Sequence, residues 1–345
     1  MGYGMSSTRV FEFQGDKVLE EVLTQLLELS DLTVNFDSGT GKVHALDGIN
    51  LCLDKGEVLA LVGESGSGKT TLARAILNVI PCPPGEIETG RILFQGQDIL
   101  RMDEKECNTR IRGRAITLIP QDPFSAANPL FTIGTQLRDI FKTPKHKEKE
   151  MEVRMASLLH QLQLPSASDL LRKYPHELSG GQLQRVMIAA SLLPDPLLII
   201  ADEPTTSLDV TVEAQILQLI RKLVKERDVS VLFITHNLAV ASKVSDRVLV
   251  MYAGQVMEYA STSSFFTETI HPYSRKLLEC LPNPRGEIKD IGGVVPNLID
   301  PPTGCRFSPR CEKGKPECGR VKPTITEKTP GHWVSCYNHT THSTR

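Results

Sequence analysis

The sequence lacks three features, and each absence excludes a class of protein. It carries no strong charge of either sign: Lys and Arg number 39, Asp and Glu number 41, and the net charge is −2. Bulk electrostatics therefore gives no reason to expect a nucleic-acid partner. No apolar stretch approaches the ~20 residues that span a bilayer, so a membrane-spanning helix is not expected. The first residues lack a basic segment followed by an apolar one, so we expect no secretory signal.

What the sequence contains is an alternation of short apolar runs and helical patterns. With 345 residues, 40% hydrophobic and 23% charged, the composition is that of a globular protein with a sizeable core. Three runs predict strands buried on both faces of a parallel sheet: Val58–Val62, Leu197–Ala201 and Val231–Ile234. Alternating segments at 32–36, 49–53 and 91–94 predict an antiparallel β layer around the first of these runs. An α/β fold follows.

The stretch "LVGESGSGKTT" joins the first buried strand to a helix expected from Thr70. Gly63, Gly66 and Gly68 can adopt positive φ, so the backbone can curl and direct its N–H groups inward. Gly63-x4-Gly68-Lys69-Thr70 is the phosphate-binding loop pattern. In that pattern the amides cradle phosphates, the lysine reaches the β and γ oxygens, and the hydroxyl is offered to Mg²⁺. We therefore predict a nucleotide site.

Two carboxylates follow the second buried strand. Asp202 stands where that strand ends, at the edge of the sheet where α/β ligand sites gather, and its carboxylate can hold Mg²⁺ directly or through water. Glu203 comes next and is placed to polarise a water against the terminal phosphate. A third feature, "LSGGQ", opens a helical pattern: Ser179 predicts an N-cap, and Gly180 and Gly181 let an anion approach the backbone.

These motifs together resemble those of the ABC ATPases. Leu178–Gln182 is similar to the family signature and precedes Asp202 by about the family's distance. Gln121 matches the Q-loop glutamine, Ser207-Leu208-Asp209 the D-loop, and His236 the switch histidine. The resemblance implies a P-loop NTPase core of ABC type with an antiparallel β layer, a helical subdomain and a small Cys-rich C-terminal extension.

The resemblance also implies roles for individual residues. ATP is expected between the phosphate loop of one subunit and the signature of another, with Glu203 as general base and His236 at the γ-phosphate. Mg²⁺ is expected on Thr70, Gln121 and Asp202, and Phe36 is expected to stack on adenine, with His44 as the alternative. The ATP-contacting set is Phe36, Gly63, Ser65, Gly66, Ser67, Gly68, Lys69, Thr70, Thr71 and Gln121; the residues acting on the partner's ATP are Ser179, Gly180, Gly181 and Gln182, with Ser207 and Asp209 in the D-loop.

Two further segments narrow the resemblance to the oligopeptide/dipeptide/nickel importer ATPases. They are "QDPFSAANPLFTIG" around Gln121 and "HPYSRKLLECLP" from His271. The resemblance implies a peptide-import motor that lies peripherally on the cytoplasmic face of the cell membrane. Its implied partners are two transmembrane permease subunits, a second, non-identical ATPase subunit and an extracytoplasmic substrate-binding protein. Nickel or oligosaccharide uptake, or a non-transport ABC ATPase, are the alternatives.

Half of the eight cysteines cluster near the C-terminus: Cys305, Cys311, Cys318 and Cys336. Their spacing is neither the Cys-x2-Cys of common zinc sites nor a ferredoxin run. Four thiolates can nevertheless close a tetrahedral Zn²⁺ site or a [4Fe–4S] cluster. Disulfides are disfavoured because an ATP-driven motor works in the reducing cytosol. The importer resemblance favours [4Fe–4S], with Zn²⁺ and unligated thiols as alternatives.

We expect the chain to divide into an N-terminal extension (1–24), a nucleotide-binding domain (25–265) with its helical subdomain at about 125–195, and a C-terminal extension (266–345) that holds the cysteine cluster.

Overall fold

The computed structural model describes residues 25–141, 148–164, 166–206, 209–281 and 290–338. The extension predicted for residues 1–24 and the D-loop residue Ser207 lie outside these ranges. Within them, no helix combines the length and the apolar character that crossing a bilayer requires.

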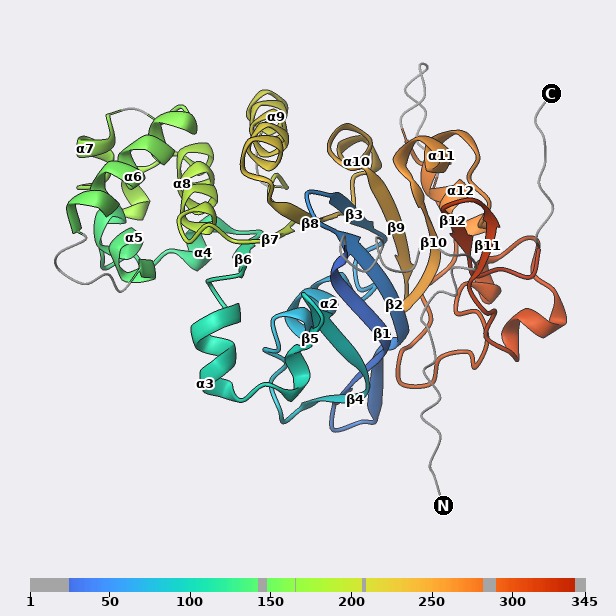
Figure 1. The fold of residues 1–345 in the computed structure, drawn as a ribbon. Coiled ribbons are helices and arrows are strands. Elements are labelled where there is room, and N and C mark those ends of the chain that lie inside the picture. Colours follow the sequence, from blue (N-terminus) through green and yellow to red (C-terminus); the bar gives the residue numbers. More distant parts are fainter. Residues whose placement is uncertain (1–24, 142–147, 165, 207–208, 282–289, 339–345) are drawn as a thin grey trace, which may run out of the picture.

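The described residues form two sheets (Figure 1). The large sheet has the order β11-β12-β10-β9-β3-β8-β7-β6, and its strands β9, β3, β8, β7 and β6 run parallel. The small sheet has the order β2-β1-β4-β5 and is antiparallel. The strands of the large sheet are β3 (Val58–Val62), β6 (Ile116–Ile119), β7 (Leu198–Asp202), β8 (Ser230–Thr235), β9 (Arg247–Tyr252), β10 (Gln255–Ser261), β11 (Thr326–Thr329) and β12 (His332–Val334). Those of the small sheet are β1 (Gln25–Asp37), β2 (Lys42–Asp54), β4 (Gly85–Phe94) and β5 (Gln97–Asp98).

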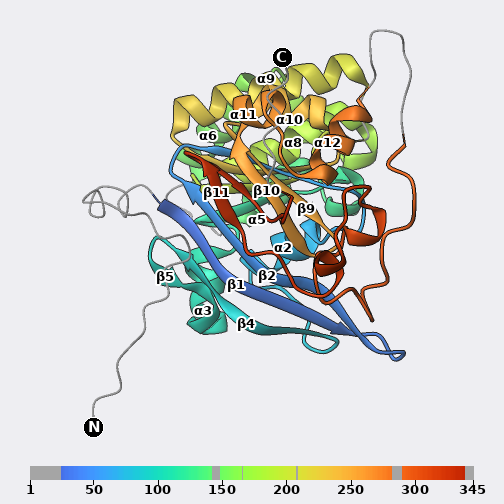
Figure 2. The same cartoon turned by 90° about the vertical axis from the view of Figure 1, so that its right-hand side faces the viewer.

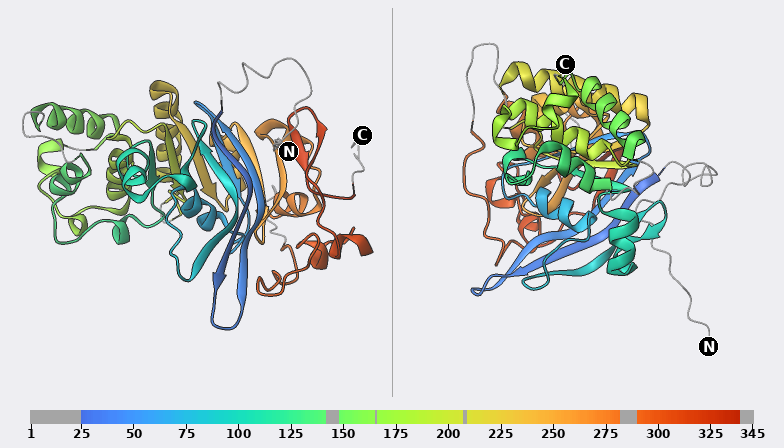
Figure 3. Two further views of the ribbon diagram at one scale, coloured as in Figure 1. Left: turned by 60° about the horizontal axis from the view of Figure 1, so that its bottom comes forward. Right: turned by 90° about the vertical axis from the view of Figure 1, so that its left-hand side faces the viewer.

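The helices occupy three regions. Helices α5 to α8, drawn in green, gather at one end of the molecule, beyond β6 and β7 (Figure 1 and the left view of Figure 3). Helices α9 and α10 lie on one face of the large sheet, and α2 lies on the other (Figure 1). The bounds are α2 (Lys69–Ile76), α3 (Glu104–Glu106), α4 (Pro123–Ala126), α5 (Ile133–Phe141), α6 (Glu148–Gln161), α7 (Ala167–Leu170), α8 (Gly180–Leu192), α9 (Val210–Arg227), α10 (Leu238–Val244), α11 (Thr262–Thr267) and α12 (Pro272–Glu279).

Alternation along the central strands gives each face of the large sheet its own core. In β7, Leu198 and Ile200 pack into the cluster shared with α2 and the small sheet. Ile199 and Ala201 pack into the cluster shared with α8 and α9. Both faces are therefore covered, which explains the unbroken apolar sequence of the parallel strands. The predicted α/β core and antiparallel layer are confirmed.

The C-terminal region, meaning the described residues from 266 onward, adds strands β11 and β12 to the edge of the large sheet. Strand β12 pairs with β10 through Glu258 and Val334, and β11 pairs with β12 (Figure 2). Glu258 is fully buried and accepts hydrogen bonds from the main-chain N–H groups of Ile270 (2.8 Å) and His271 (3.0 Å). It also contacts His332 Nε2 at 2.7 Å, so one carboxylate joins β10, the start of α12 and β12.

His271 makes the folded state sensitive to acid. Its buried ring caps α12, where Nδ1 accepts the N–H of Tyr273 at 3.0 Å. Burial lowers the pKa of His271 from 6.5 to about 4, against the opposing charge of Glu258. Because the unfolded chain binds this proton more readily, the contribution is present above about pH 6.5 and is lost as the pH falls toward 4.

We predict that acidification from pH 7.5 to 5.0 costs about 2 kcal/mol of unfolding free energy through this residue alone. His271→Asn keeps a capping acceptor but does not titrate, so this part of the pH dependence should disappear. Urea unfolding of both proteins at the two pH values measures it. An identical loss in the Asn variant would contradict the assignment.

Candidate active site

The site lies where three neighbouring parallel strands end. Val62 at the end of β3 pairs with Thr235 at the end of β8, and Asp202 at the end of β7 pairs with Ile234. The phosphate loop, His236 and Glu203 follow these strands directly. The carboxyl edge of the sheet thus brings together three sequence motifs, as α/β topology favours.

The loop backbone adopts the curled form that its glycines permit. Gly63, Gly66 and Gly68 have φ of 156°, 76° and 100°. A Cβ on Gly63 would lie 2.1 Å from the carbonyl oxygen of Met251, and one on Gly68 would lie 2.9 Å from that of Ala45. Glycine is therefore required at these two positions for two reasons: the positive φ and the close approach of a neighbouring backbone carbonyl.

Lys69 begins α2 and points back into the loop. Its side chain is buried, and Nζ donates to the carbonyls of Gly63 (2.8 Å) and Glu64 (2.9 Å) and to Ser67 Oγ (3.3 Å). Burial lowers the pKa of Lys69, although nearby carboxylates oppose the shift. A desolvated ammonium of this kind favours an anionic ligand.

Two of the three magnesium ligands predicted from the sequence, Thr70 and Asp202, lie in contact, whereas the third, Gln121, contacts Glu203. Thr70 Oγ1 donates to Asp202 Oδ2 at 3.3 Å. Burial raises the pKa of Asp202, and the neighbouring charge of Glu203 adds to the increase. A hydroxyl and a partly desolvated carboxylate are hard oxygen ligands, so the pair fits Mg²⁺. Of the other loop positions, Ser65 is exposed and Thr71 is half-buried in the first turn of α2.

Glu203 is the centre of a polar cluster. Its carboxylate accepts hydrogen bonds from Gln121 Nε2 (3.0 Å) and Thr206 Oγ1 (3.0 Å) and lies 3.1 Å from His236 Nδ1. The backbone of Glu203 is left-handed, with φ of 46°. Residues other than glycine are strained in this conformation, and such strained residues occur most often at functional sites. The structure therefore brings together Glu203, His236 and Gln121. Thr206 was not predicted as a site residue, because no motif in the sequence includes it.

The signature residues belong to a different part of the chain. Ser179 caps α8: its Oγ accepts the N–H of Gln182 at 3.3 Å, and Gln182 Oε1 accepts the N–H of Ser179 at 3.1 Å. Gly180 and Gly181 form the first turn of α8, which packs against α4, α5, α6 and β6, whereas α2 packs against β2 and β7. Asp209 caps α9 through two main-chain N–H groups.

The two adenine candidates lie on paired strands. Phe36 on β1 pairs with Val43, and its ring packs against the Gly85 backbone. His44 on β2 pairs with Asn35. The next residue is Ala45, whose carbonyl oxygen would lie 2.9 Å from a Cβ on Gly68. Adenine stacking by either residue stays a prediction.

The prediction of a [4Fe–4S] cluster is wrong, and so is its zinc alternative. Among the described residues, which include Cys305, Cys311, Cys318 and Cys336, no group of three or more His, Cys, Asp or Glu side chains could hold a metal ion. All four are free thiols. Burial raises the pKa of Cys305 to about 12. Cys318 and Cys336 instead accept main-chain N–H groups within their own turns.

The fold and the site together define a P-loop nucleotide-binding protein. Comparison with protein families adds two matches that follow each other along the chain. Residues 46–206 match "ABC transporter", and residues 257–318 match "Oligopeptide/dipeptide transporter, C-terminal region".

Characterised relatives cover most of the chain. The oligopeptide transport ATP-binding protein OppD of Bacillus subtilis is 41% identical over 320 residues, which is 91% of this chain and 89% of the relative. OppD of Escherichia coli is 42% identical over 319 residues, which is 90% of this chain and 93% of the relative. The dipeptide transport ATP-binding protein DppD of Bacillus subtilis is 40% identical, over 91% of this chain and 95% of the relative.

Solved structures agree on the fold. The ATP-binding cassette MJ0796, in a dimeric post-hydrolysis state with ADP and Pi, gives a TM-score of 0.61 at 27% identity, covering 69% of this chain and 99% of that one. CbiO1 of Clostridium perfringens gives a TM-score of 0.62 at 28% identity, and the match covers 76% of this chain and 97% of that one. The chain belongs to the ABC transporter ATP-binding proteins of the oligopeptide/dipeptide type, and it is an ABC ATPase.

The close approach at Gly63 yields a prediction. Gly63→Ala should weaken MgATP binding by more than about tenfold, because the added Cβ must displace the loop from the Met251 carbonyl. Gly39→Ala is the control: Gly39 also has positive φ, 73°, but nothing lies within 4 Å of its Cβ position. Calorimetric titration measures both affinities. Equal affinities for the two variants would contradict the role of the contact.

Proposed function

We propose that this chain is the ATP-hydrolysing motor of an ABC importer that takes up dipeptides or oligopeptides. The observation that carries the proposal is the order of the two family matches. An ATP-binding segment is followed in the same chain by a region named for oligopeptide and dipeptide transporters. The OppD and DppD relatives, named for peptide transport, cover both segments.

The phosphate loop holds the triphosphate. The amides between Gly63 and Thr70 and the ammonium of Lys69 bind phosphate oxygens, and the N-terminus of α2 adds its favourable field. Thr70 and Asp202 would hold Mg²⁺, with Gln121 as the further ligand implied by the family pattern. When bound, Mg²⁺ neutralises charge on the β- and γ-phosphates.

Glu203 acts as the general base. Its carboxylate takes a proton from the water that attacks the γ-phosphate, and the amide of Gln121 and the hydroxyl of Thr206 orient it. His236 lies within 3.1 Å of the same carboxylate, and its exposed ring can reach toward the γ-phosphate. Gln121 thus contacts the base directly, which suits the predicted task of reporting nucleotide occupancy to a partner.

Ser179, Gly180, Gly181 and Gln182 complete the nucleotide site of a second subunit. Support comes from their location: they open α8, in the helical group and apart from α2. The dimeric MJ0796 structure adds support for paired cassettes. We further propose a non-identical partner ATPase, two transmembrane permease subunits and an extracytoplasmic binding protein. The chain would then lie peripherally at the cytoplasmic face of the membrane.

The cargo is tested on the assembled importer. The complex is purified from its own cells through an affinity tag on this chain, reconstituted in liposomes and supplied with its binding protein. Dipeptides or oligopeptides should stimulate ATP hydrolysis, whereas nickel chelates and oligosaccharides should not. Stimulation by nickel or sugar alone would contradict peptide import while leaving the ATPase assignment intact.

The base is tested by Glu203→Gln. This change should leave MgATP affinity near that of the wild type but slow hydrolysis by about 10²–10⁴-fold, because proton acceptance is lost while the hydrogen-bonding shape remains. The variant should also trap the ATP-bound dimer. Glu226→Gln, an exposed change on α9, is the control. Wild-type turnover in Glu203→Gln would remove Glu203 from this role.

A further inference from the structure

The C-terminal region reaches the phosphate loop through an ion pair. Arg310, between Cys305 and Cys311 in the chain, donates from Nη1 to both carboxylate oxygens of Glu64, at 3.1 and 3.0 Å. Glu64 is the residue directly after Gly63 in the loop. The Arg310 side chain is 5% exposed and that of Glu64 is 27% exposed, so the pair is largely shielded from water.

The same residue of the loop is also held through its main chain. The N–H of Glu64 donates to the Tyr273 hydroxyl at 3.0 Å, and Tyr273 lies on α12. The rings of Tyr273, Tyr252 and Phe307 pack together with centroids 4.7 to 5.2 Å apart. Arg310 lies over the Tyr252 ring and donates to its hydroxyl at 3.0 Å. A rigid aromatic cluster therefore fixes both groups that hold Glu64.

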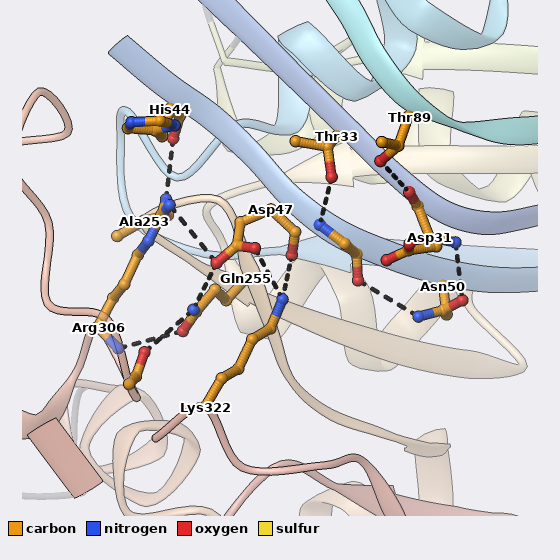
Figure 4. A network of polar contacts seen from close by, with 12 residues as sticks. Asp31, Thr33, His44, Asp47, Asn50, Thr89, Ala253, Gln255, Arg306 and Lys322 are labelled. Atoms are coloured by element: carbon orange, nitrogen blue, oxygen red, sulfur yellow. Dashed lines mark hydrogen bonds and ion pairs between the residues drawn. The ribbon is translucent and has the colours of Figure 1, made fainter. Parts of the chain in front are cut away.

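A second contact supports the other side of the loop. Arg306 donates to the carbonyls of Ala253 and His44, and its guanidinium lies 3.5 Å from Asp47 (Figure 4). Gly254, next to Ala253, donates its N–H to the carbonyl of Ser67 in the loop at 2.9 Å. The C-terminal region thus supports the loop directly at Glu64 and, through one turn, at Ser67.

Glu64 affects both the position of Lys69 and the charge of the loop. Its carbonyl accepts a hydrogen bond from Lys69, so a shift of Glu64 would move a contact of the phosphate-binding lysine. An unpaired carboxylate beside bound phosphates would repel them, and in a partly desolvated site this repulsion is strong. Arg310 supplies the opposite charge at hydrogen-bond distance and cancels it.

We propose that Arg310 and Tyr273 are positioning residues for nucleotide binding: they fix Glu64 in the phosphate loop, and Arg310 neutralises its charge. The C-terminal region is then part of the ATP site, and affinity for MgATP depends on its attachment. The inference rests on the proposed function as an ATP-driven motor and assigns to it residues beyond the loop, the base and the signature.

The test measures MgATP affinity and steady-state hydrolysis on the full chain. Arg310→Gln should raise the Kd and the KM for MgATP about tenfold and leave kcat within about twofold, because Arg310 does not touch the attacking water or the base. Lys315→Gln is the matched control. It also removes one positive charge from the C-terminal region, but Lys315 is exposed and its ammonium pairs with Glu317 at 3.9 Å, which is not a loop residue. It should leave the KM unchanged.

A double-mutant cycle separates positioning from general structural support. Glu64→Gln removes the carboxylate that Arg310 neutralises, so Arg310→Gln should cause little further loss in that background. A merely structural role predicts that the two losses add. Arg310→Lys keeps the charge but loses the planar guanidinium that contacts Glu64 and the Tyr252 ring together, so it should lie between wild type and Arg310→Gln. Thermal unfolding checks that each variant is folded, and Arg310→Lys carries the comparison if Arg310→Gln is not.

The outcomes are distinct. A KM for Arg310→Gln equal to that of Lys315→Gln, or additive losses in the cycle, would overturn the inference. MgATP binding by the wild-type chain would still uphold the proposed function in that case. Failure of the wild-type chain to bind MgATP would overturn the proposed function and this inference with it.

Discussion

The structure depends on one constraint: the backbone of residues 63–68 must curl tightly against the end of β9. The Met251 carbonyl lies so close to Gly63 that any Cβ there would reach within 2.1 Å of it. That contact fixes where the loop leaves β3 and where α2 begins, and hence where Lys69 lies. The parallel register then brings the ends of β7 and β8 to the same edge of the sheet, where Asp202, Glu203 and His236 lie.

Burial then sets the chemistry of the loop. It lowers the pKa of Lys69 and raises that of Asp202, so the charged forms of both are less favourable than in water. A ligand that brings anionic oxygens to the lysine and a divalent cation to the carboxylate relieves both costs at once. Magnesium nucleotide has this character. Glu64 would disturb the balance, and its pairing with Arg310 explains how an acidic residue is accommodated in a phosphate-binding loop.

The parts of the site that depend on local sequence could be predicted. Glycine spacing predicted the positive φ at Gly63, Gly66 and Gly68, and "LSGGQ" predicted the cap at Ser179. The contacts of Glu64 could not be predicted, because its partners Tyr273 and Arg310 lie 209 and 246 residues away and no periodicity links them. The prediction of a metal cluster rested on the number of cysteines near the C-terminus and on the importer resemblance, and neither of these gives the surroundings of the thiols. Each of Cys318 and Cys336 is hydrogen-bonded within its own turn, and no metal-binding group is formed in the described residues.

The central claim is that curled backbone and a buried lysine hold a magnesium-bound triphosphate at the start of α2. Isothermal titration of the full chain with MgATP, beside Lys69→Ala, tests it most directly. The account predicts saturable binding of one nucleotide per chain, reduced at least about a hundredfold in Lys69→Ala because a desolvated, charge-assisted contact is lost. Equal binding by the two proteins, or none by the wild type alone or in its assembled complex, would contradict it.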